Sequence, residues 1–137
     1  MKQNKWKKLG HLYSLPKAGL HSKLLTHASN PTPVLLEGDV YRVFFSGRDV
    51  NNRSSIGAVD IDIQNQSIVH EHQDPFFMHG SCDSYYSDGV TIGNTYTVNE
   101  NRYILFMGWK NPEKSHWYGE IGRLLLKPDL SLELDCD

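Results

Sequence analysis

Two carboxylates stand where short apolar runs give way to glycine-containing turns, and both could take part in acid–base chemistry. Asp49 closes the segment "SGRD", and Asp88 lies within "SDGV". A carboxylate beside a bound ligand can take up or release a proton. Beside a turn, Asp also commonly accepts hydrogen bonds from the backbone. The sequence supports both interpretations of these two residues.

Arginine and aromatic side chains occur in the same kinds of segment. Arg48 and Arg53 stand on either side of the first carboxylate, Tyr86 stands just before the second, and Trp109 ends a later apolar run. Guanidinium groups bind carboxylates and hydroxyl groups, and aromatic rings bury a large apolar area. Arg48 is explained equally well by an ion pair, and Trp109 by packing between sheets. Asn30, directly before a proline, could simply cap or turn the chain.

Seven histidines raise the question of a metal site. His70 and His72 share one face if they lie on a strand, but no third ligand follows at a useful spacing. Cys82 and Cys136 are isolated and form no CxxC pair. We therefore predict no metal and no cofactor, and we expect both thiols to be reduced and unpaired.

Short β-strands must position all of these residues. The segment "YRVFFS" alternates aromatic and β-branched residues with others between two glycine-containing turns, which is typical of a strand. No long segment has a convincing helical period, so the predicted fold class is all-β. The expected strands cover residues 33–36, 41–46, 55–61, 67–70, 90–96, 103–109, 118–126 and 131–134.

The same strand pattern occurs twice in the sequence. Phe45-Ser46-Gly47-Arg48 aligns with Phe106-Met107-Gly108-Trp109 (106 − 45 = 61), and Ile56-Gly57 aligns with Ile121-Gly122 (121 − 56 = 65). A repeat of this length, built from short antiparallel strands, is typical of β-propeller blades. We predict one domain over residues 1–137, with a lead-in strand at 1–30, a four-stranded blade at 31–75 and a second at 85–137.

The sequence resembles the start of the five-bladed β-propeller glycosidases, closest to glycosidase-like proteins related to glycoside hydrolase families 43, 32 and 130. The resemblance covers roughly residues 6–134 and is carried by "NP" before the first inner strand, "SGRD" after the second, and "DGV" before the next blade.

This resemblance implies a sugar-binding axis at which acidic residues of successive blades converge. Asp49 and Asp88 are then the candidate catalytic carboxylates. Asn30 occupies the place where family 43 enzymes carry an aspartate, and an amide cannot act as the general base. The implied substrate-binding residues are Asn30, Arg48, Arg53, Tyr86 and Trp109.

Composition and charge narrow the classes of function. The chain has 39% hydrophobic residues, 22% charged residues and a formal charge of −2. These values are ordinary for a globular protein and argue against a nucleic-acid binder, which usually carries a concentrated basic face. No apolar run is long enough to span a membrane or to form a signal peptide. The expected location is cytoplasmic.

Two blades are too few to close a propeller, so we expect their apolar faces to be covered by self-association into a homo-oligomer. Three functions remain open. The favoured one is a carbohydrate-binding, glycosidase-like fragment with an oligosaccharide ligand and little catalysis alone. The others are a glycoside hydrolase or phosphorylase whose site is completed by oligomerisation, and a structural or interaction protein without a sugar ligand.

Overall fold

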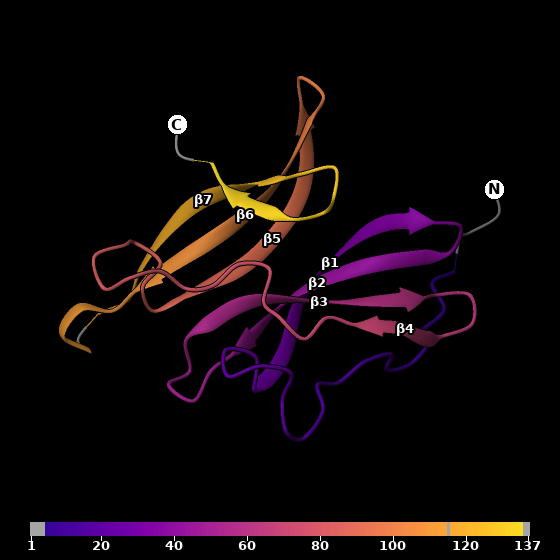
Figure 1. Ribbon diagram of the computed structural model, residues 1–137, viewed down its shortest axis with the longest axis horizontal. Helices are drawn as coiled ribbons and strands as arrows, with labels where there is room; N and C mark the ends of the chain where they lie inside the picture. Colours follow the sequence, from indigo (N-terminus) through magenta and orange to yellow (C-terminus); the bar gives the residue numbers. More distant parts are fainter. Residues whose placement is uncertain (1–4, 115, 136–137) are drawn as a thin grey trace.

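The computed structural model describes residues 5–114 and 116–135. The fold is all-β, which confirms the predicted class, and the eight strands expected within the two blades are present (Figure 1). Six of them are longer than expected, the strand at 118–126 has the expected bounds, and the last strand begins one residue later than expected, at Leu132. The strands are β1 (Thr26–Glu37), β2 (Val40–Arg48), β3 (Ser54–Asp62), β4 (Ser67–Glu71), β5 (Gly89–Val98), β6 (Asn101–Lys110), β7 (Tyr118–Leu126) and β8 (Leu132–Leu134). A short 3-10 helix, η1 (Pro112–Lys114), interrupts the loop before β7.

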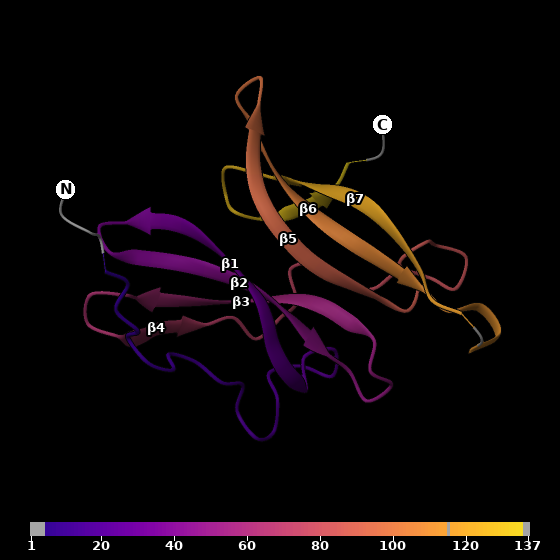
Figure 2. The ribbon, with the colours of Figure 1, turned by 180° about the vertical axis from the view of Figure 1, so that it is seen from behind.

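The eight strands form one open sheet in the order β1-β2-β3-β5-β6-β7-β8, with β4 paired to β3. All pairings are antiparallel except that between β3 and β5, where Ser54 pairs with Gly89. We call β1–β4 the first meander and β5–β8 the second. Figures 1 and 2 show them as two separate groups of strands that meet near the start of β5. Their radial arrangement as propeller blades stays a prediction.

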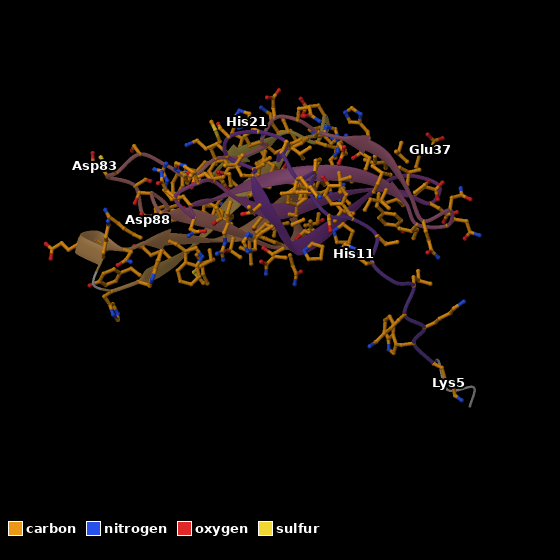
Figure 3. The ribbon with its side chains drawn as sticks, turned by 90° about the horizontal axis from the view of Figure 1, so that it is seen from below. Lys5, His11, His21, Glu37, Asp83 and Asp88 are labelled. Carbon is orange, nitrogen blue, oxygen red and sulfur yellow. The ribbon has the colours of Figure 1, made fainter. Side chains whose placement is uncertain are left out.

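The lead-in differs from the predicted strand at 1–30, of which residues 1–4 lie outside the described residues. Residues 5–25 are irregular apart from an isolated bridge between His21 and Leu24, and β1 begins at Thr26. Gly10 and Gly19 have positive φ values of 104° and 72°, which lie outside the range of regular β-strand. Lys5, near the beginning of the described chain, lies well away from the sheet (Figure 3). Further along the lead-in, Leu12, Leu15 and Leu20 pack against the first meander.

Two apolar layers result from this arrangement. Between the lead-in and the first meander lie Leu24, Phe45, Val59 and Ile61, with Leu12, Tyr13, Leu15 and Leu20 packed against them. Between the two meanders lies a larger cluster made of Val34, Phe44, Ile56, Ala58, Val90, Ile92, Ile104, Phe106, Leu124 and Leu126. The first meander is therefore covered on both faces, which makes it the middle layer.

The sequence repeat is also a repeat of packing. Phe45 lies directly across from Gly57 in the β2–β3 pair, and Phe106 lies directly across from Gly122 in the β6–β7 pair. A Cβ atom added to Gly57 would come within 2.8 Å of the Phe45 ring, and one added to Gly122 within 2.5 Å of the Phe106 ring. Each phenylalanine ring thus folds over the glycine opposite it, and each faces the preceding layer.

The outer face of the second meander is not covered by any part of the chain that the structure describes. Leu105 and Ile121 on this face are 38% and 73% exposed. The residues at the equivalent positions of the first meander, Phe44 and Ile56, are both 0% exposed because the second meander covers them. We call the surface around Leu105 and Ile121 the open face. Within the described residues, no helix has the length and apolar character needed to cross a membrane.

Candidate functional site

A cleft of about 690 Å³ lies where the two meanders meet. The end of β2, the β2–β3 turn and the start of β3 supply one side of it, and the start of β5, the end of β6 and the loop before β7 supply the other. This volume is within the range of about 300–1,000 Å³ that is usual for small-ligand sites. We call it the junction cleft. Its lining residues are Arg48, Asn51, Asn52, Arg53, Ser54, Asp88, Thr91, Trp109 and Trp117.

The β2–β3 turn is built around Asp49. Its Oδ1 accepts hydrogen bonds from the backbone N–H groups of Asn51 and Arg53, both at 2.9 Å, and its own N–H donates to the Arg53 carbonyl at 3.0 Å. Asn52 takes the left-handed conformation, with a φ of 61°, that asparagine adopts more readily than most residues. Because this carboxylate holds the turn closed, Asn51 and Asn52 are presented to the cleft.

Asp49 also holds the guanidinium of Arg53. Arg53 Nε and Nη2 lie 3.1 and 3.0 Å from Asp49 Oδ2, and His79 Nε2 and Lys23 Nζ lie 3.4 and 3.9 Å from the same oxygen. Burial alone would raise the pKa of Asp49, but hydrogen bonds from the turn backbone and from Arg53 bring it below its usual value. The carboxylate is therefore ionised and surrounded by donors. It lies behind the cleft, and its catalytic role stays a prediction.

The second meander contributes an aromatic side to the cleft. The indole N–H of Trp109 donates a hydrogen bond of 2.9 Å to Thr91 Oγ1, which fixes the plane of the ring. The Trp117 ring meets it edge to face, with centroids 6.3 Å apart. Two indoles in contact therefore border the same space, and Trp117, which is more than half exposed, leaves part of this surface open to solvent.

Asp88 is held by the backbone on either side of the end of β6. Its backbone N–H donates to the Trp109 carbonyl at 2.9 Å, and its Oδ2 accepts from the Asn111 backbone N–H at 2.8 Å and from Ser87 Oγ at 3.4 Å. Among the lining residues that the structure describes, Asp88 is the one carboxylate. It is thus placed to accept a hydrogen bond from a ligand.

Four of the seven predicted site residues line this one cleft, and three do not. Arg48, Arg53, Asp88 and Trp109 come together from the two meanders. Tyr86 packs against the core next to Phe77 and Phe106. Asn30 is exposed in an irregular part of β1, with a φ of 56°. Asp49, as described above, supports the cleft from behind.

The chain is similar to a longer mycobacterial protein. The match is to "Uncharacterized protein MT1551" of Mycobacterium tuberculosis (strain CDC 1551 / Oshkosh) and to "Uncharacterized protein Rv1502" of strain ATCC 25618 / H37Rv, each 33% identical over 118 residues. These residues are 85% of this chain and 39% of each relative, so the chain spans well under half their length. No family model and no solved structure matches the chain.

Sequence reasoning missed five lining residues: Asn51, Asn52, Ser54, Thr91 and Trp117. The two asparagines lie between two predicted arginines, and this neighbourhood was the available signal for them. Trp117 follows the irregular loop after β6, so no strand pattern places it. Its position depends on how the loop returns the chain to β7.

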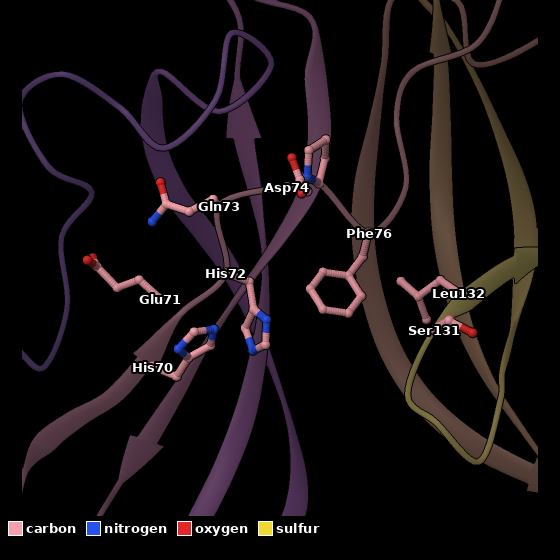
Figure 4. Close-up of a pocket in the computed structure, with 9 residues that line it drawn as sticks. His70, Glu71, His72, Gln73, Asp74, Phe76, Ser131 and Leu132 are labelled. Carbon is pink, nitrogen blue, oxygen red and sulfur yellow. The ribbon is translucent and has the colours of Figure 1, made fainter.

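A second pocket, of about 530 Å³, lies between the end of β4 and the turn before β8 (Figure 4). The His70 and His72 rings point toward one another there, with centroids 4.5 Å apart. His72 Nε2 lies 3.1 Å from Asp60 Oδ2, yet burial lowers the pKa of His72. No group of three or more His, Cys, Asp or Glu side chains suited to a metal ion occurs in residues 5–114 and 116–135. None of the predicted site residues lines this pocket.

Proposed function

We propose that the junction cleft is a carbohydrate-binding site and that the chain is a glycosidase-like portion of a β-propeller. One observation supports this most directly. Four residues that the glycosidase resemblance assigned to sugar binding or catalysis, and that are separated by up to 61 positions (109 − 48 = 61), line the same cleft. A second indole, which the sequence did not predict, lies beside them.

The chemistry of the lining suits a sugar. A pyranose ring has an apolar face, which the indoles of Trp109 and Trp117 can bury. Its hydroxyl groups both donate and accept hydrogen bonds. Arginine and asparagine side chains from the β2–β3 turn supply donors, whereas Asp88 and the asparagine carbonyls supply acceptors. The cleft therefore combines stacking surfaces with convergent polar groups, as small-ligand sites commonly do.

Binding is favoured over catalysis by the position of the carboxylates. Glycoside hydrolysis commonly uses two carboxyl groups on either side of the scissile bond. Asp88 lines the cleft, whereas Asp49 lies behind it and Asn30 does not line it. A hydrolase would need a further carboxylate beside Asp88, whereas a phosphorylase would use phosphate as the attacking group. A hydrolase or phosphorylase whose site is completed by oligomerisation is our second candidate. The alternative without a sugar ligand is an outcome of the experiment below.

We also propose that the open face of the second meander packs against a second copy of this chain. A monomer would leave Ile121 and Leu105 in water, and large uncovered apolar surfaces are typical of interaction sites. Stacking of this face onto the first meander of another copy is blocked, because the lead-in already covers that meander. Two open faces can instead meet around a two-fold axis, which closes the assembly at two chains.

Isothermal titration calorimetry with a panel of oligosaccharides tests the sugar-binding proposal. We expect at least one member to bind the wild-type chain. Trp117→Ala should weaken that binding about tenfold, the equivalent of about 1.4 kcal/mol, which is of the order of one stacked ring.

Trp6→Ala is the matched control, because Trp6 is fully exposed in the lead-in and absent from the cleft lining. Its affinity should equal that of the wild-type chain. Absence of binding across the whole panel would reject the carbohydrate function and leave the structural or interaction protein. Equal affinities for the Trp117→Ala variant and the wild-type chain would show that the sugar binds outside this cleft.

A further inference from the structure

We infer that the ligand of the junction cleft is an acidic carbohydrate whose carboxylate or phosphate group is bound by Arg48, with Arg53 beside it. This inference rests on the proposed sugar-binding function and specifies the class of sugar. It follows from the distribution of charge in and directly behind the cleft.

The cleft carries more positive than negative groups, although the whole chain has a formal charge of −2. Arg48 and Arg53 line it, and Lys23 lies behind Arg53 against the same carboxylate. Two carboxylates, Asp49 and Asp88, stand against these three cations. The local balance is therefore one positive charge, which a neutral sugar would leave uncompensated.

Arg48 is the group that carries this excess. Arg53 is held by Asp49, whereas no carboxylate of the described residues lies within ion-pair distance of the Arg48 guanidinium. The backbone of Arg48 is firmly placed, because its carbonyl accepts from Leu25 N–H at 2.8 Å and the residue pairs with Ser54 across the β2–β3 ladder. The side chain thus extends into the cleft from a fixed strand end.

The two sides of the cleft would bind different parts of the ligand. A sugar ring on the indoles of the second meander would direct its outer substituents toward the β2–β3 turn. There the planar guanidinium can donate two parallel hydrogen bonds to a carboxylate or a phosphate. The Oδ2 atom of Asp88 already accepts a hydrogen bond from the Asn111 N–H. This carboxylate would repel an anion but can accept a further hydrogen bond from a sugar hydroxyl. The anionic group is therefore directed to Arg48 and away from Asp88.

Matched pairs of sugars test this inference by titration calorimetry. One arm uses uronic-acid oligosaccharides of gluco, galacto and manno configuration against the same oligosaccharides with their carboxyl groups reduced. The other uses sugar phosphates of the same configurations against the dephosphorylated sugars, with inorganic phosphate alone as a reference. We expect the acidic member of at least one pair to bind at least tenfold more tightly in low salt, and the difference to shrink as ionic strength rises.

Arg48→Gln should remove this preference and leave the affinity for the neutral member within about twofold. Arg102→Gln is the matched control. Arg102 is also exposed and without an ion pair among the described residues, and it lies seven residues before Trp109 on β6, roughly 23 Å away. This control should keep the full preference for acidic sugars.

The outcomes separate this inference from the function on which it rests. Equal binding of acidic and neutral members would overturn the inference and keep the carbohydrate function. No binding by either member of any pair would reject both. Inorganic phosphate that binds as tightly as the sugar phosphates would show a bare anion site and overturn the acidic sugar. A preference that survives Arg48→Gln would also overturn the assignment, because another group would then bind the anion.

Discussion

The buried hydroxyl of Ser46 accepts a hydrogen bond of 2.9 Å from the backbone N–H of Ile92, and this contact joins β2 of the first meander to β5 of the second. A similar contact runs from Thr32 Oγ1 in β1 to the Gly93 carbonyl at 2.6 Å. Because both lie next to the apolar cluster, water cannot easily replace them. These two side chains align the meanders and so help to form the junction cleft.

Replacing Ser46 by alanine should destabilise the protein by about 1–3 kcal/mol, because the Ile92 N–H is left without a partner in a buried place. Urea denaturation followed by circular dichroism measures the free energy of unfolding. Ser67→Ala is a suitable control, since Ser67 is exposed at the start of β4. Equal stabilities for the two variants would show that the Ser46 contact contributes nothing.

Gly122→Ala should destabilise the protein by about 1–3 kcal/mol through overpacking. The added Cβ would lie 2.5 Å from the Phe106 ring, which is itself held in the core between the meanders. Gly119→Ala, in the same strand, brings its Cβ against the flexible end of Met107 at 2.9 Å and should cost clearly less. Thermal melting compares the two. A larger loss in Gly119→Ala would contradict the packing of Phe106 over Gly122.

Stability should decline in acid as Asp49 and Asp60 take up protons. Hydrogen bonds from Arg53 and the turn backbone lower the pKa of Asp49, and those from Arg42 and His72 lower the pKa of Asp60, in both cases against the effect of burial. A carboxyl whose pKa is lower in the folded state contributes stability that is present above its unfolded value, near 3.8. This contribution is lost as the pH falls from there through the folded pKa.

The variant Asp49→Asn tests this dependence. At pH 7 it should be less stable than the wild-type chain by about 1–3 kcal/mol, because charged hydrogen bonds to Arg53 are lost. The difference should narrow between about pH 4 and pH 2, where the wild-type carboxyl itself is neutralised. Urea denaturation across this range follows both proteins. A difference that stays constant with pH would show that the charge of Asp49 does not matter.

Ile121→Lys should weaken self-association. Ile121 stands at the centre of the open face, where a charge would have to be buried between two copies. Light scattering over a range of protein concentrations measures the molar mass, which we expect to fall from two chains to one. Val69→Lys, on the exposed strand β4, serves as the control and should behave as the wild-type chain does. A wild-type protein that is monomeric throughout would reject the two-fold assembly.

Local sequence was enough to predict the strands and the duplicated unit. Alternation of aromatic and β-branched residues marks β2, β3 and β6 without any knowledge of their neighbours. The repeated phenylalanine and glycine pairs also predicted that the two meanders would be built alike, and they have the same register. Within the candidate site, Arg48 and Trp109 were predicted from the resemblance to the propeller glycosidases, and both lie in the cleft.

Only the tertiary structure decided which polar residues share a cleft. Asp49 and Asp88 have similar sequence surroundings, yet one is enclosed by Arg53, Lys23 and His79 while the other borders open space. Tyr86 packs against the core, and Trp117 lines the cleft from a loop. The physical reason is that the alternation of a strand specifies two faces and not what covers each of them. Coverage depends on contacts between segments far apart in the chain, which no local pattern contains.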